Sequence, residues 1–178
     1  MREDRRIRRP RLRPPRLPPA RRRPGTVDRP RGEGDPPAAA KALVEDARVA
    51  HLATSDQYAN PHVVPIVFVF EDPHLYTPID SKPKSVTDWR RLRRVQNVVT
   101  NGRASVVVDA WSEEWSELRY VLLEGTADVL EGGAERDHAL TLLEAKYPQY
   151  ARMPLGDAPV IRVTVERRRE WSGAEAAP

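Results

Sequence analysis

Two lysines stand directly before a predicted helix, in the stretch Asp80-Ser-Lys-Pro-Lys84. Ser85 is a favourable N-cap residue and Asp88 follows three positions later, as in a capping box, so we expect a helix to begin at Ser85. The N-terminus of a helix carries roughly half a positive charge and disfavours each nearby cation by about 0.3–1 kcal/mol. A bound anion would offset this repulsion. Free helix N–H groups together with lysines indicate a phosphate site.

The same two lysines allow a second interpretation. Pro83 restricts the backbone around Lys82 and Lys84, which limits how far their ammonium groups can separate. Both could nevertheless point into water, with the carboxylate of Asp88 compensating their charge. Spacing alone leaves both interpretations open.

Other residues with chemical potential have simpler explanations. Arg90, Arg91 and Arg94 fall on one side of the predicted helix and are typical of a solvated face. No carboxylate stands at a readable spacing from His51, His74 or His138, so we expect structural or surface roles for these histidines. Three tryptophans, Trp111, Trp115 and Trp171, could line a pocket or pack in a core or a dimer interface.

The elements that would position these residues are mostly short strands. We expect strands over 49–54, 62–71, 74–77, 104–111, 119–130 and 160–165, and helices over 38–46, 85–101 and from about 134 to 147. Strand 62–71 is almost continuously apolar, and Pro65 within it requires a bulge or a sheet edge. Gly125 predicts a bend or bulge. Six strands joined mainly as hairpins close most economically as an antiparallel barrel.

The N-terminal segment differs from the rest in composition. Residues 1–40 contain thirteen arginines, no lysine, five acids and nine of the 18 prolines, a net charge of +8 against +4 for the whole chain. Such a segment buries too little apolar surface to offset its ordering entropy. We therefore expect disorder over 1–37, one ordered domain over 38–172 and disorder over 173–178. The basic tail could bind nucleic acid, although it has no aromatic residue for base stacking.

Composition also excludes several classes of protein. The chain has no cysteine, so disulfides, thiolate chemistry and Cys-ligated metals are excluded. It has no apolar run of the ~18 residues that span a bilayer, and residues 1–40 lack the apolar region of a signal peptide. We expect a cytoplasmic protein that does not enter membranes.

Several short motifs occur in the order and spacing of a known superfamily. They are Arg48–Thr54, Asn60–Pro65, Leu75–Thr77, Asp80–Lys84, Leu92–Asn97 and Arg103–Asp109. Over about residues 40–172 the sequence resembles the split β-barrel flavin and deazaflavin proteins of the pyridoxamine 5′-phosphate oxidase superfamily, and within it the coenzyme F420-dependent branch. The resemblance implies a mainly β fold with helices (α+β), a six-stranded antiparallel split β-barrel of the FMN-binding type, and a homodimer.

The resemblance also implies a cofactor site. Strand residues 62–67 would lie along the flavin or deazaflavin ring, largely through their backbone, while Lys82 and Lys84 would hold the cofactor phosphate. The implied cofactor-binding residues are His62, Val63, Val64, Pro65, Tyr76, Thr77, Ser81, Lys82, Lys84 and Arg119. No catalytic residue and no metal ligand is implied, because the cofactor carries the chemistry.

The sequence departs from the FMN oxidases of this superfamily at three positions. His62 and Val67 stand where those proteins have basic residues, and Tyr120 stands where they have a glutamine. Fewer phosphate ligands favour coenzyme F420 over FMN. We therefore expect an F420-dependent oxidoreductase that transfers a hydride between the deazaflavin and a small organic acceptor. The alternatives are an FMN-binding oxidase or flavin reductase, and a non-catalytic flavin or F420 binder.

Overall fold

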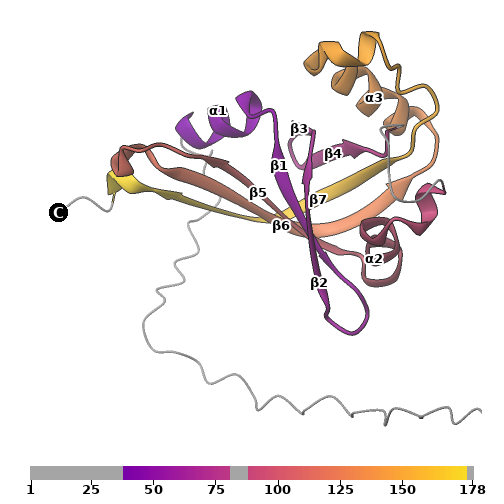
Figure 1. Ribbon diagram of the computed structural model, residues 1–178, viewed down its shortest axis with the longest axis horizontal. Coiled ribbons are helices and arrows are strands. Elements are labelled where there is room, and N and C mark those ends of the chain that lie inside the picture. The colour runs from indigo at the N-terminus through magenta and orange to yellow at the C-terminus, as the bar shows by residue number, and fades with distance from the viewer. Residues whose placement is uncertain (1–37, 81–87, 176–178) are drawn as a thin grey trace, which may run out of the picture. The chain divides into compact units, whose positions relative to one another are not determined.

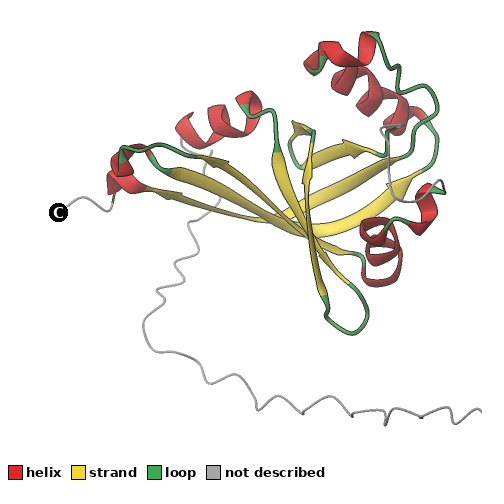
Figure 2. Cartoon of the chain, viewed as in Figure 1, coloured by secondary structure: helices red, strands yellow, loops and turns green. Residues whose placement is uncertain are grey.

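The computed structural model describes residues 38–80 and 88–175. Figures 1 and 2 show one sheet with helices around it. The helices are α1 (Ala38–Asp46), α2 (Arg93–Asn101) and α3 (Ala134–Lys146), with short 3₁₀ turns at Trp89–Arg91, Trp115–Glu117, Pro148–Ala151 and Gly173–Glu175. The strands are β1 (Ala50–Ser55), β2 (Pro61–Ile66), β3 (Val69–Glu71), β4 (His74–Pro78), β5 (Arg103–Ala110), β6 (Arg119–Leu130) and β7 (Val160–Ser172).

The sheet is antiparallel throughout and strongly curled. Its strand order is β2-β1-β5-β6-β7-β4-β3. The two edge strands, β2 and β3, are consecutive in the sequence and are joined only by Val67 and Phe68. The sheet must therefore bend back on itself to bring its edges together, which gives a half-barrel. The predicted mainly β, antiparallel architecture is confirmed.

The number of strands differs from the prediction, because the expected strand 62–71 is two strands and the sheet has seven instead of six. Between the two strands, at Phe68, the Tyr147 hydroxyl forms the hydrogen bonds that a neighbouring strand would otherwise provide. It accepts the Phe68 N–H at 2.9 Å and lies 2.8 Å from the Phe68 carbonyl oxygen and 3.0 Å from that of Arg48. Backbone groups satisfied by a side chain need no ladder partner. Pro65 lies in edge strand β2, as its missing N–H requires.

The pair formed by β6 and β7 is the longest in the sheet. Its register shifts between Glu124 and Gly125, which confirms the predicted bulge. Glycine is needed there because a Cβ at Gly125 would lie 1.9 Å from the carbonyl oxygen of Thr164.

Strand β7 runs to Ser172, whereas the predicted strand ended at residue 165. Order also continues beyond the predicted boundary at 172. The N–H of Gly173 donates to the carbonyl oxygen of Leu118 at 2.7 Å, so the turn Gly173–Glu175 is tied to the start of β6.

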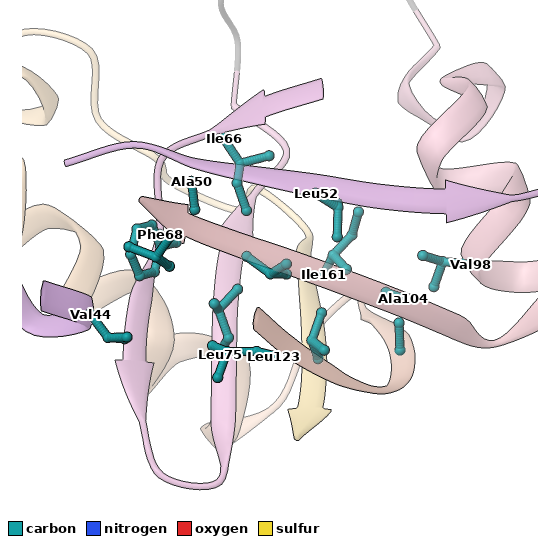
Figure 3. Packing of buried hydrophobic residues seen from close by; sticks show 14 of the residues in the cluster. Val44, Ala50, Leu52, Ile66, Phe68, Leu75, Val98, Ala104, Leu123 and Ile161 are labelled. Atoms are coloured by element: carbon teal, nitrogen blue, oxygen red, sulfur yellow. The ribbon is translucent and has the colours of Figure 1, made fainter. Parts of the chain in front are cut away.

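The apolar interior has two parts. The main cluster fills the curled sheet, where Leu52, Phe68, Leu75 and Leu123 are fully buried (Figure 3). The second cluster packs α3 against β3 and β4 through side chains that include Leu143. Burying a side chain of this size stabilises the fold by about 1.5–3 kcal/mol. The two clusters give β2, β4 and α2 a fixed framework.

Candidate functional site

The helix predicted to begin at Ser85 begins at Arg93. Asp88 is extended (φ −85°, ψ 111°) and caps the separate turn Trp89–Arg91, its carboxylate accepting the N–H of Arg90 at 3.0 Å. Leu92 is extended as well and precedes α2 without a side-chain cap. The predicted start of the α-helix is therefore wrong, while the predicted N-cap Ser85 lies outside the described residues. Asp88 is a cap, but of the 3₁₀ turn.

Two arginines consequently occupy the first turn of α2. Arg93 and Arg94 lie where the unpaired N–H groups of the helix give a positive potential. The imidazole of His62 on β2 lies close to both. Partial burial lowers the pKa of His62, and the charges of Arg93 and Arg94 lower it further. Cations at a helix N-terminus, which the sequence suggested for Lys82 and Lys84, are thus observed at Arg93 and Arg94.

Arg94 is the most unusual of these cations. Its side chain is half-buried and forms no hydrogen bond or ion pair with any residue in the described parts of the chain. Burial lowers the pKa of Arg94, while the Asp80 carboxylate raises it. The Asp80 carboxylate does not serve Arg94 alone, since it also accepts a hydrogen bond from the hydroxyl of Tyr150 at 3.1 Å. A desolvated guanidinium without a bonded counter-charge costs free energy, which an anionic ligand would recover.

Strand β2 gives the neighbourhood an apolar, hydrogen-bonding surface. Its side chains alternate, with Pro61, Val63 and Pro65 exposed and His62 and Val64 half-buried. As an edge strand β2 pairs with β1 on one side only, so the N–H and C=O groups on its other side are available. Apolar side chains beside free backbone groups suit a flat heterocyclic ring that carries its own donors and acceptors.

The predicted site residues on β4 are buried. The Tyr76 hydroxyl donates to Oε1 of Glu135 at 3.0 Å, and Arg162 binds the same carboxylate at 2.9 Å. Burial, followed by the hydrogen bond to Glu135, raises the pKa of Tyr76 to about 12. The proton of this hydroxyl is therefore donated to Glu135 on α3. Thr77 is also buried, and by strand alternation its side chain faces away from that of Tyr76.

The remaining predicted residues fall into two groups. Ser81, Lys82 and Lys84 lie outside the described residues, between Asp80 and the turn that leads into α2. Arg119 begins β6 and lines a different cleft of about 430 Å³, beneath α1. Within one chain the structure thus brings His62 within electrostatic reach of Arg93 and Arg94, whereas Arg119 lines another cleft.

A larger cleft adjoins the cation cluster. It has a volume of about 720 Å³ and extends from the β1–β2 turn to α2, with Tyr58, Trp89 and Arg93 among its lining residues. The guanidinium of Arg90 stacks 4.2 Å from the centroid of Trp89 and binds Glu131 at 2.6 Å. Arg93 lines this cleft and its charge also lowers the pKa of His62, so it is the residue that the cleft and the cation cluster share.

Arg93 and Arg94 were missed by sequence reasoning. The helical wheel placed Arg94 on a solvated face because it assumed one helix from Ser85. In the structure the extended Leu92 separates a 3₁₀ turn from α2 and places both arginines at the start of the α-helix. No residue pattern in the sequence indicates this break.

Two histidines have carboxylate partners that sequence spacing does not reveal. Nδ1 of His51 lies 3.5 Å from Oδ1 of Asp109, and Nε2 of His138 lies 3.0 Å from Oε2 of Glu71. Both pairs are exposed, so they remain surface interactions of small energy.

Within residues 38–80 and 88–175, no group of three or more histidine or acidic side chains is arranged to hold a metal ion. No helix in the same residues combines the length and apolarity needed to cross a membrane.

The curled antiparallel sheet with its edges joined at Phe68 defines a split-barrel protein. A family profile described as pyridoxamine 5′-phosphate oxidase matches residues 36–172. The chain belongs to this family. No curated protein sequence matches it significantly.

Solved structures show the same fold at low sequence identity. A conserved hypothetical protein from Mycobacterium tuberculosis is 18% identical, with a TM-score of 0.62 over 80% of this chain and 89% of that chain. HutZ, a heme storage protein from Vibrio cholerae, is 15% identical, with a TM-score of 0.58 over 74% and 90%. An FAD-binding protein from Mesorhizobium loti is 22% identical, with a TM-score of 0.54 over 74% and 91%.

Proposed function

We propose that the protein is a coenzyme F420-dependent oxidoreductase that transfers a hydride between the deazaflavin and a small organic acceptor. The observation that carries the proposal is Arg94, a half-buried guanidinium at the uncapped start of α2 that has no bonded partner among residues 38–80 and 88–175. Such a group fits the phosphate that F420 and FMN both contain.

The described residues would divide the work of binding. Arg94 and Arg93, with the nearby His62, hold the phosphate, and the edge of β2 around Val63 and Val64 supports the ring through apolar contact and backbone hydrogen bonds. When bound, the deazaflavin supplies or accepts the hydride. The protein orients the ring and excludes water from one of its faces, so it needs no nucleophile or acid–base pair of its own.

FMN remains the alternative cofactor, because the cation cluster suits the phosphate of either molecule. His62, which replaces a fixed cation of the FMN oxidases, favours F420. Partial burial and two neighbouring arginines lower the pKa of His62, so it is mostly neutral at pH 7 and adds little charge to the phosphate site.

A homodimer is part of the proposal, supported by the outer face of the sheet. Val63 is 59% exposed, Tyr120 39% and Trp171 40%. The rings of Tyr120 and Trp171 stack with centroids 5.8 Å apart. Exposed apolar side chains on β2, β6 and β7 are typical of a surface that a second subunit covers. A partner would also enclose the exposed side of β2.

Titration of the cofactor-free protein with F420 and with FMN, followed by fluorescence, tests the choice of cofactor. We expect strong quenching of F420 only. Arg94→Gln should weaken F420 binding about 10- to 150-fold, corresponding to the 1.5–3 kcal/mol of a hydrogen bond to a charged group. The matched control is Arg91→Gln, an exposed arginine in the preceding 3₁₀ turn, which should change the affinity less than twofold. Equal effects of the two substitutions would contradict the site.

Enzymatic activity needs its own measurement. Reduced F420 bound to the protein should be oxidised only when an electron-poor organic acceptor is added. Binding without acceptor-dependent oxidation, over a broad panel of acceptors, would identify a cofactor-binding protein instead of an enzyme.

A further inference from the structure

Lys146 occupies an unusual environment at the end of α3. Its Nζ lies 4.3 Å from the ring centroid of Phe68 and 5.8 Å from that of Tyr147. Both rings are buried, and the lysine side chain itself is half-buried. The ammonium group therefore packs against two aromatic rings, which displace part of its hydration.

The charges around Lys146 do not compensate for this burial. No carboxylate in the described residues forms an ion pair with its Nζ. The guanidinium of Arg48 lies 4.7 Å from the centroid of the same Tyr147 ring and repels the ammonium, while Asp46 and Glu45 on α1 attract it less strongly. Burial and then Arg48 lower the pKa of Lys146 to about 8, against about 10.4 for an ordinary lysine.

We propose that Lys146 is a modification site, at which its amine is acylated by small acyl phosphates without the help of an enzyme. An unprotonated amine is the nucleophile, and the aromatic surroundings favour that form. Nζ attacks the acyl carbon, an N–C bond forms, the C–O bond to phosphate breaks, and the phosphate leaves while the amine proton passes to water. The Arg48 guanidinium is placed to attract the phosphate of the donor.

Lys41 provides an internal control. It lies on α1, is exposed, and forms an ion pair with Glu45 at 3.8 Å. At neutral pH an amine with a pKa of about 8 is unprotonated roughly 200-fold more often than one with a pKa of 10.4. The Lys146 amine is a weaker nucleophile because it is less basic, and its partial burial hinders the donor. Both effects offset part of this advantage, so we expect Lys146 to react about tenfold faster than Lys41.

The experiment incubates the full-length native protein with acetyl phosphate at a series of pH values from 6.5 to 10 and quantifies acetylation of each lysine by peptide mass spectrometry. The expected result is preferential acetylation of Lys146, with a rate that rises with pH, has its midpoint near pH 8 and levels off above about pH 9. In denaturant the two lysines should react equally. Equal rates for Lys146 and Lys41 in the native protein, or a midpoint above pH 9.5, would overturn the proposal.

A variant separates this environment from simple exposure. Arg48→Gln leaves the aromatic rings in place and removes the neighbouring cation, so the midpoint for Lys146 should rise and its rate at pH 7.5 should fall several-fold. Acetylation of Lys41 should not change. An unchanged rate at Lys146 would show that Arg48 neither lowers its pKa nor attracts the donor.

Discussion

The Tyr147 hydroxyl is the smallest feature on which the closure of the sheet depends. It serves the backbone of Phe68 and of Arg48, which belong to segments 79 and 99 positions earlier in the chain. Desolvation raises the pKa of Tyr147, so the hydroxyl stays protonated and can both donate and accept. Nothing local in the sequence indicates this contact, because its partner is a backbone group far away along the chain.

Tyr147→Phe should therefore destabilise the protein. The phenyl ring keeps its packing, but the buried Phe68 N–H and carbonyl lose their partner, at a cost of about 1–3 kcal/mol. Urea unfolding followed by fluorescence measures the loss. Tyr58→Phe, at a ring that is 77% exposed, is the control and should stay within about 0.5 kcal/mol of the parent. A loss no greater than that of the control would remove Tyr147 from this role.

Glu135 predicts a pH dependence of stability. Its burial opposes ionisation, but hydrogen bonds from Arg162 and Tyr76 outweigh burial and hold its pKa below the usual value. The folded protein then releases this proton more readily than the unfolded chain, so the contribution is complete above about pH 4.3 and is lost as pH falls through the folded pKa.

Glu135→Gln tests this contribution by thermal unfolding at pH values from 3 to 7. The variant should lose about 0.5–1 kcal/mol at pH 7, as for a partly exposed ion pair, and should lose less further stability than the parent below pH 4.3. Glu113→Gln, in the exposed acidic loop, is the control. Parallel curves for parent and Glu135→Gln would contradict the assignment.

At the scale of elements, proline and glycine gave reliable predictions, because their effects follow from the backbone of the residue itself. Pro65 predicted a bulge or a sheet edge and lies in an edge strand, and Gly125 predicted a bend or bulge and lies at one. The predicted helix end at residue 101 is also observed, with Gly102 at φ 68° after it. The start of α2 was predicted wrongly, because Ser85 and Asp88 match a capping box while the chain forms a 3₁₀ turn and an extended Leu92 first. Whether the α-helix begins after the first candidate cap or only after Leu92 depends on tertiary packing, which the sequence does not show.

The bulge in β6 makes a sharp prediction about glycine. Gly125→Ala would place a methyl group 1.9 Å from a backbone oxygen of β7, so the longest strand pair would have to separate locally. We expect a loss of at least about 3 kcal/mol in the free energy of unfolding. Gly132→Ala, where a Cβ meets nothing within 4 Å, should change stability by less than about 1 kcal/mol. Similar losses in both variants would show that β7 yields easily at this point.

At the scale of the whole ordered domain, the fold was recognisable and the site only partly so. Motif order from Arg48 to Asp109 was sufficient for the family. The approach of His62 to Arg94 was not predicted, because it depends on how α2 closes one end of the curled sheet. The prediction for Lys82 and Lys84 lies outside the described residues and stays a prediction.

The proposed dimer can be tested through two exposed valines. Val63→Asp places a charge on the outer face of the sheet, where a second subunit would bury it, and should convert the protein to monomers at micromolar concentration. Val99→Asp, at a valine of α2 that is 71% exposed, should leave the mass unchanged. Light scattering coupled to size-exclusion chromatography gives the masses. A monomeric parent protein would contradict the dimer outright.

The strand order has a consequence for how the chain matures during synthesis. Strand β7 pairs with β4 on one side and with β6 on the other. One edge of β4 and one edge of β6 therefore stay unpaired until β7, the last strand to be synthesised, has left the ribosome. Until residues 160–172 emerge, the nascent polypeptide exposes apolar strand edges of the kind that chaperones recognise. Premature termination shortly before Val160 should therefore yield an insoluble product, even though such a fragment would retain most of the residues of the domain.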